Sequence, residues 1–120
     1  MPGDATGVLM GWAAAFVDTL AIETPIYLWL LRERGWRLGF TVALLGNALT
    51  HPFAWWLVRS SERAWSRFGA AELFAWLSEA LLLVLLARAF DKRIGWSQSV
   101  WITLAANATS AGIGLLIAGL

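Results

Sequence analysis

Residues 69–90 read GAAELFAWLSEALLLVLLARAF, and this stretch decides the fold class of the chain. It is mostly apolar, and it matches the length of about 20 residues that an α-helix needs to cross the ~30 Å hydrocarbon layer of a bilayer. Three other segments meet the same test, so we predict an all-α integral membrane protein built as a four-helix bundle. The four predicted spans are about Gly7–Leu31, Gly39–Val58, Gly69–Phe90 and Ser99–Gly119.

The composition of the whole chain agrees with burial in lipid. Of its 120 residues, 59% are hydrophobic and 14% are charged, and the mean hydropathy is +0.65. A soluble domain of this size needs more polar surface to stay dispersed in water. The net charge of +1 does not supply the basic patch of a nucleic-acid-binding protein, and the absence of cysteine excludes disulfides and zinc–thiolate sites. We therefore expect a single transmembrane domain over residues 1–120, surrounded by lipid and without a cofactor.

The basic residues set the expected orientation. Eight of the nine lie in the three connectors between spans, and the ninth, Arg88, lies at the end of the third span beside the third connector. Six basic residues thus belong to the first and third connectors and three to the second. Because basic connectors stay in the cytoplasm, we expect both termini on the periplasmic side of a bacterial inner membrane, with dual insertion as the open alternative. The first eleven residues contain no Lys or Arg, so no cleavable signal peptide is predicted. The basic residues are Arg32, Arg34, Arg37, Arg59, Arg63, Arg67, Arg88, Lys92 and Arg93.

Tryptophan is unusually frequent, with nine copies. Eight of them fall near the ends of the predicted spans, where the amphipathic indole ring is favoured at the membrane–water interface. We interpret these eight as interfacial anchors rather than as the lining of a ligand pocket. They are Trp12, Trp29, Trp36, Trp55, Trp56, Trp65, Trp96 and Trp101, whereas Trp76 lies inside a span.

Two polar landmarks recur in the same order in both halves of the chain. The segment Glu23–Arg32, ETPIYLWLLR, matches Glu79–Arg88, EALLLVLLAR, at an offset of 56 residues. At an offset of 60, Asn47–Thr50 matches Asn107–Ser110, and both read Asn-Ala-x-hydroxyl. Recurrence of this kind indicates a duplicated unit.

The repeat predicts where these residues lie in space. Spans one and three run in the same direction, so the halves, residues 7–58 and 69–120, would be parallel helical-hairpin repeats. Parallel repeats are related by an axis along the membrane normal, and shared sites form at their interface. We therefore expect Glu23 and Glu79 to face each other, together with Asn47 and Asn107.

Four acidic residues lie within the predicted spans: Asp18, Glu23, Glu72 and Glu79. An ionised carboxylate at the centre of a bilayer costs at least about 2.5–3.5 kcal/mol, so each of these acids needs compensation. The spans offer no basic partner at that depth. The remaining options are protonation, a bound cation, water in a polar cavity, or a basic group from another subunit.

Polar side chains on spans two and four extend this set. Asn47, Thr50 and His51 stand at i, i+3 and i+4 and share one helical face. Asn107 and Ser110 belong to a similar stripe of small and hydroxylated residues on span four. The two asparagines suit ligand contact and interhelical hydrogen bonding equally well. The candidate ligand- or ion-binding residues are Glu23, Glu79, Asn47, Asn107, His51, Thr50, Ser110, Asp18 and Glu72.

Two prolines stand close to these polar residues. Pro25 frees the backbone carbonyl near Ala21, and Pro52 frees the one near Ala48. Because lipid cannot satisfy a free carbonyl, we expect both kinks to point inward at one polar cavity. The alternative is a bend that only improves helix packing.

Three functions fit these patterns. The first is proton- or cation-linked transport or ion conduction, with Glu23 and Glu79 as the ion-binding pair in a homo-oligomer. The second is a non-catalytic accessory subunit, in which the acids meet Lys or Arg of a larger membrane complex. The third is an intramembrane enzyme that uses the carboxylates with His51 and a metal ion, for which the sequence shows no ordered catalytic or metal motif. We rank them in this order.

Overall fold

The computed structural model describes residues 2–59 and 64–117, and within them it contains helices and no strands. Side chains are described for residues 13–53 and 69–116. The helices are α1 (Pro2–Leu30), α2 (Trp36–Arg59), α3 (Ala64–Ala89) and α4 (Trp96–Ile117), with a short 3-10 turn, η1 (Arg32–Arg34), after α1. The predicted all-α class is confirmed, and each predicted span corresponds to one helix.

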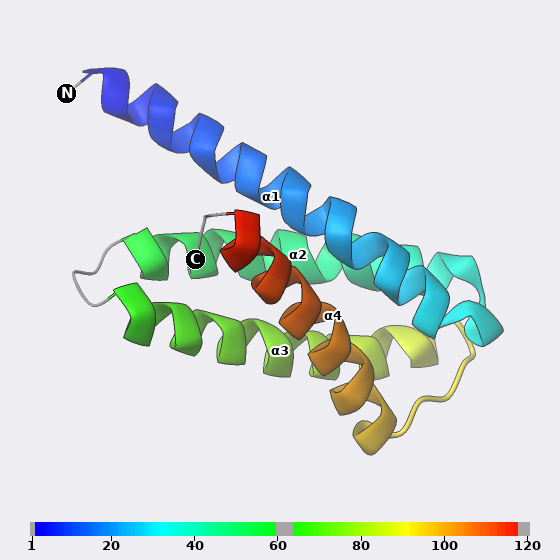
Figure 1. Cartoon of the computed structure of the whole chain (residues 1–120). Helices are drawn as coiled ribbons and strands as arrows, with labels where there is room; N and C mark the ends of the chain where they lie inside the picture. Colours follow the sequence, from blue (N-terminus) through cyan, green and yellow to red (C-terminus); the bar gives the residue numbers. More distant parts are fainter. Residues whose placement is uncertain (1, 60–63, 118–120) are drawn as a thin grey trace.

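Successive helices run in opposite directions and close into a ring (Figure 1). Helix α1 packs against α2 and α4, and α3 packs against the same two helices from the opposite side. Helices α1 and α3 are therefore diagonal neighbours across the bundle. We call the end that holds η1 and the α3–α4 turn the connector end, and the opposite end the terminus end.

Three helices in the described part of the chain are long and apolar enough to cross a membrane. The qualifying segments are Ala13–Leu30, Gly69–Ala89 and Trp96–Leu116. Helix α2 does not qualify over its described side chains, because Arg37, Asn47 and His51 lower its hydropathy. Three of the four predicted spans thus have the required length and composition, and the second span stays a prediction.

The main cluster of buried apolar side chains in the described part of the chain lies in one half of the bundle. Its buried side chains come from all four helices, and each lies on the connector side of the level of Glu23, Asn47, Glu79 and Asn107. We call this core the apolar plug. Its members are Tyr27, Leu31, Leu38, Val42, Ala43, Leu83, Ala87, Ile94, Ile102 and Ala106.

Glycine allows the plug to close tightly between α1 and α2. A Cβ on Gly39 would lie 3.0 Å from the Tyr27 carbonyl oxygen and 3.1 Å from the Leu28 Cα. These are backbone atoms that cannot step aside, so any larger side chain would separate the two helices.

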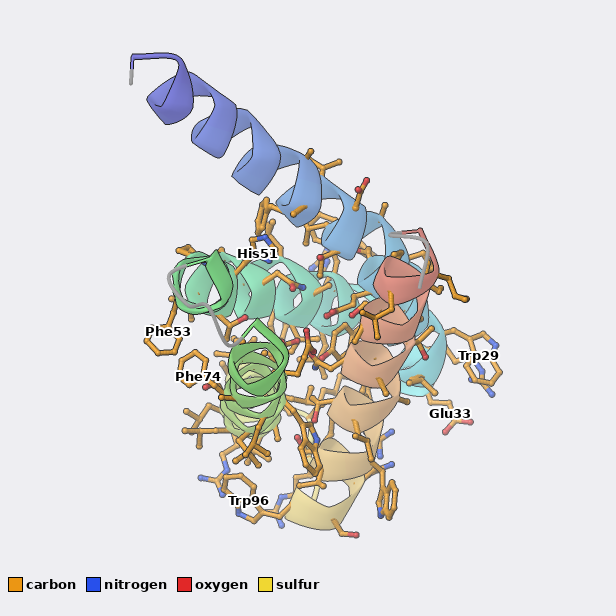
Figure 2. All side chains as sticks on the ribbon, turned by 60° about the vertical axis from the view of Figure 1, so that its left-hand side comes forward. Trp29, Glu33, His51, Phe53, Phe74 and Trp96 are labelled. Atoms are coloured by element: carbon orange, nitrogen blue, oxygen red, sulfur yellow. The ribbon has the colours of Figure 1, made fainter. Side chains whose placement is uncertain are left out.

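The described tryptophans support the interfacial interpretation. Trp29, Trp36, Trp96 and Trp101 are 55–67% exposed, and Figure 2 shows Trp29 and Trp96 pointing away from the bundle. Trp76 is half-buried, and its indole N–H donates to the Val100 carbonyl at 2.9 Å, which ties α3 to α4. The predicted anchors Trp12, Trp55, Trp56 and Trp65 lie outside the described side chains.

Candidate functional site

Glu23 and Glu79 meet at the centre of the bundle, where the plug ends. Glu23 is 1% exposed and Glu79 is 0% exposed, although they come from the diagonal helices α1 and α3. The two carboxyl groups lie close enough to interact directly. The structure therefore brings the two repeated glutamates together, as the repeat predicts.

The Glu23 carboxyl is held by donors from the two helices that flank α1. The Asn47 amide on α2 donates from Nδ2 to Glu23 Oε1 at 3.2 Å. The Ser110 hydroxyl on α4 donates to Glu23 Oε2 at 2.6 Å. Both oxygens of this carboxyl group thus have a hydrogen-bond donor, and the site joins α1, α2 and α4.

The Glu79 carboxyl is held less completely. The Tyr27 hydroxyl donates to Glu79 Oε1 at 2.8 Å, and the Asn107 amide also interacts with this carboxyl group. The second oxygen, Oε2, is buried and completes no hydrogen bond within the described part of the chain. An unsatisfied buried oxygen is costly, so this atom is a natural acceptor for a proton or a cation.

Gly46 on α2 provides the space that the Glu79 side chain occupies. A Cβ at Gly46 would lie 2.9 Å from Glu79 Cγ and 3.2 Å from Oε1. Real Cβ atoms essentially never approach other atoms at 2.9 Å. The missing side chain is therefore a requirement of the site, because any other residue would displace Glu79.

No basic residue neutralises the pair within the described side chains. The guanidinium of Arg32 lies 4.5 Å from the Trp29 ring and donates to the Trp29 carbonyl, and Arg34 donates to Gln98 at 2.9 Å. These arginines are engaged at the connector end, on the far side of the apolar plug. The central carboxyl groups are accordingly surrounded by neutral donors and by each other.

Glu72 lies near this pair, toward the terminus end. It stands two helical turns before Glu79 on α3, is partly buried, and interacts electrostatically with both Glu23 and Glu79. The structure thus places three of the four predicted acids within electrostatic range of one another.

The remaining polar candidates, Asn107, Thr50 and His51, differ in their burial and in their hydrogen bonds. Asn107 is buried and donates to the Thr103 carbonyl at 2.9 Å, and Thr50 is buried and donates to the Gly46 carbonyl at 2.8 Å. His51 is half-buried between α1 and α2, with its ring centroid 5.4 Å from that of Phe16 (Figure 2). Among the described residues, no group of three or more His, Cys, Asp and Glu side chains has an arrangement that could hold a metal ion.

Asp18 does not join the cluster. It is exposed on α1 and lies more than one helical turn before Glu23. Helix α1 diverges from the other helices toward its N-terminus (Figure 1).

The expectation that both proline kinks point into the site is wrong. Pro25 and Pro52 are exposed, and so are Ala21 and Ala48, whose carbonyls the prolines free. Both prolines lie inside continuous helices. The two prolines therefore face the outside of the bundle. This agrees with the alternative interpretation, in which they bend their helices without contributing to a ligand site.

Two residues of the site, Tyr27 and Gly46, are absent from the residues that the sequence predicts. Tyr27 is the only tyrosine of the chain and stands four residues after Glu23, so it shares the helical face of that glutamate. This spacing is a signal that could have identified it. Gly46 carries no such signal, because its role depends on which α3 residue packs against it.

The comparisons with known proteins leave the function to be argued from this geometry. No protein-family model matches the chain, and neither the search of curated proteins nor the search of solved structures finds a match.

Proposed function

We propose that this chain is an integral membrane protein in which Glu23 and Glu79 together bind a proton or a small cation during transport or ion conduction. The observation that carries the proposal is the meeting of two enclosed carboxyl groups from diagonal helices, without a basic partner among the described side chains. Ionised carboxylates only accept hydrogen bonds, so two of them in one buried site repel each other unless a positive charge lies between them.

The hydrogen-bond donors around the two carboxyl groups leave one position for a bound proton or cation. Asn47 and Ser110 satisfy both oxygens of Glu23, and Tyr27 satisfies one oxygen of Glu79. The open atom is Glu79 Oε2, which has no hydrogen-bond partner in the described part of the chain. A proton or cation at this oxygen would complete the site without any rearrangement of the helices.

The arrangement also supports the proposed duplication. The repeat pairs Glu23 with Glu79 and Asn47 with Asn107, and each asparagine interacts with the glutamate of its own half. The repeat also pairs Ser110 with Thr50. Ser110 donates to Glu23, whereas Thr50 donates to the backbone of its own helix, and this difference leaves Glu79 Oε2 open. We therefore infer a four-span bundle of two parallel hairpins that supply their two glutamates with unequal sets of donors.

Access to the site is expected from the terminus end only. The apolar plug lies between the carboxyl pair and the connectors. On the other side lie the partly exposed side chains of Glu72 and Ser110. With basic connectors in the cytoplasm of a bacterium, this entrance would open to the periplasm.

Reconstitution into liposomes tests the proposal. Purified protein should conduct protons, measured with an enclosed pH-sensitive dye, or sodium or potassium ions, measured with a cation-sensitive dye. Replacement of either acid, in Glu23→Gln or Glu79→Gln, should lower the flux at least about tenfold, the effect of about 1.4 kcal/mol. Asp18→Asn is the matched control, because it removes an exposed carboxylate of the same helix. Unchanged flux in both glutamine variants would refute the ion-binding function.

The size of the bundle bears on the oligomeric state. Four helices enclose little volume, so we expect a homo-oligomer in which each chain carries its own carboxyl pair. Light scattering in detergent measures this state directly.

Asp18 favours a second candidate function, that of an accessory subunit. This carboxylate is exposed within the apolar segment Ala13–Leu30, where contact with lipid would be costly. A Lys or Arg of a larger membrane protein would neutralise it. In that case Asp18→Asn, and not Glu23→Gln, would abolish co-purification with a partner from native membranes, so the same pair of variants separates the two functions.

A further inference from the structure

The turn between α3 and α4 forms a surface pocket at the connector end, far from the carboxyl pair. Its volume is about 460 Å³, and it is lined by Arg88, Arg93, Ile94 and Gly95. This volume falls in the range of about 300–1,000 Å³ that is usual for small-ligand sites. The lining combines two arginines with one buried apolar side chain, Ile94.

Both arginines of the pocket are available to a ligand. Arg88 and Arg93 are exposed, and neither forms a hydrogen bond or an ion pair with another residue of the described chain. Arg32, which occupies the position equivalent to Arg88 in the first half, is used differently: it donates to the Trp29 carbonyl at 2.7 Å and stacks on the Trp29 ring. The second half has no tryptophan at the matching position, Leu85, and its arginine remains free to bind.

The start of α4 adds positive potential beside the arginines. The helix begins at Trp96, directly after the pocket residue Gly95, and its first turn contains no acidic residue. The first N–H groups of a helix lack partners inside it and attract anions. The turn itself carries three basic residues, Arg88, Lys92 and Arg93, and one acid, Asp91. The pocket is therefore suited to an anion.

The position of the pocket points to the source of this anion. Trp96 and Trp101 stand at the same end of α4 with 55% and 67% of their surfaces exposed, as expected of side chains at the membrane–water interface. The pocket thus lies at the depth of the lipid headgroups. Anionic lipids attract basic residues placed beside a span, by about 1 kcal/mol for each Lys or Arg.

We propose that this pocket binds a phosphate group, namely that of an anionic phospholipid headgroup such as phosphatidylglycerol. The two guanidinium groups pair with the phosphate oxygens, and the acyl chains continue along the apolar outer surface of α3 and α4. The proposal requires insertion of the chain in a membrane and does not depend on ion binding by the glutamates.

Native mass spectrometry of the full chain in detergent tests this site. Delipidated protein is mixed with phosphatidylglycerol or with phosphatidylcholine, and the bound fractions are compared. We expect phosphatidylglycerol to bind more tightly, and the double variant Arg88→Gln/Arg93→Gln to weaken this binding by about twenty-five-fold, or about fivefold for each arginine. The matched control is Arg32→Gln/Arg37→Gln, which removes two arginines that lie over the rings of Trp29 and Trp36. This variant should still bind phosphatidylglycerol more tightly than phosphatidylcholine.

The outcomes distinguish specific binding of the lipid from binding of a free anion and from nonspecific electrostatic attraction. Equal binding of the two lipids would overturn the proposal, and so would an equal loss in both double variants. Displacement of phosphatidylglycerol by millimolar inorganic phosphate would assign the pocket to a free anion and would overturn the lipid assignment. Circular dichroism of each variant checks that its helices are intact. A loss of ion flux in Glu23→Gln with lipid binding unchanged would show that the two sites are independent.

Discussion

Tyr27 donates its phenolic hydrogen to Glu79 Oε1 across 2.8 Å, and this hydrogen bond joins α1 to α3 through the middle of the bundle. Helices α1 and α3 are not in direct backbone contact, since each packs against α2 and α4. Tyr27 is also a member of the apolar plug. One side chain thus connects the polar site to the packed half of the protein.

This relationship predicts a loss of stability in Tyr27→Phe. The ring remains in the plug, but Glu79 Oε1 loses the donor at 2.8 Å, and an unsatisfied buried acceptor costs about 1–3 kcal/mol. Unfolding of the purified protein by titration with a denaturing detergent measures the free-energy change. Trp101→Phe, at a side chain that is 67% exposed, should change the stability by less than about 0.5 kcal/mol. Equal stability of Tyr27→Phe and the parent protein would contradict this account of the hydrogen bond.

Gly46→Ala should destabilise the bundle because its Cβ would lie 2.9 Å from Glu79 Cγ. Overpacking of this kind costs about 1–3 kcal/mol. Gly112→Ala is the control, since no atom lies within 4 Å of its added Cβ, and it should be neutral or slightly stabilising. Shortening the acid relieves the overlap, so Gly46→Ala should cost less in a Glu79→Asp background. A double-mutant cycle measures this coupling, and a coupling energy near zero would show that the two residues do not compete for space.

Two serines on α4 allow a role in the carboxyl site to be separated from a role in helix packing. Ser110 donates to the Glu23 carboxyl and Ser99 donates to the Ala80 carbonyl, both at 2.6 Å. Hydrogen bonds to charged groups contribute about 1.5–3 kcal/mol, so Ser110→Ala should reduce ion flux in liposomes about tenfold or more. Ser99→Ala should lower stability by about 1 kcal/mol and leave the flux intact. The opposite assignment, with flux lost only in Ser99→Ala, would place the pathway elsewhere.

The chain contains no cysteine, so single cysteines report accessibility without background. Ser110→Cys should react with a small membrane-impermeant thiol reagent added from the terminus side. Reagent added from the connector side should not reach it, because the apolar plug lies in between. Gln98→Cys, at an exposed residue of the connector end, should react only from the opposite side and thereby define the orientation of the vesicles. Reaction of Ser110→Cys from the connector side would show that the plug is not a seal.

The central glutamates can be predicted to meet because they recur in equivalent places of two matching segments. Their repetition, together with the cost of a carboxylate in lipid, is sufficient to pair Glu23 with Glu79. The same reasoning places Asn47 and Ser110 near them, and the structure shows both donating to Glu23. Repeated polar residues carry positional information because polar groups in a membrane-spanning helix are rare.

The rotation of each helix cannot be predicted in the same way. The sequence predicts Asp18 at the site and Pro25 and Pro52 facing inward, whereas all three are exposed. In a soluble helix the apolar face marks the interior. In this chain the outer surface is also apolar, with Leu77, Leu81 and Leu85 about half exposed, so hydrophobic periodicity does not identify the inner face.

The sequence by itself determined the helical class, the approximate bounds of the helices and the pair of glutamates that would have to be compensated, because these depend on segment length and on the energetic cost of charge in oil. Only the tertiary structure decided that Tyr27 and Gly46 shape the site, that the plug fills the connector half, and that Glu79 Oε2 lacks a donor among the described residues. These features depend on how four helices rotate and approach one another, and that packing is a property of the whole bundle rather than of any one segment.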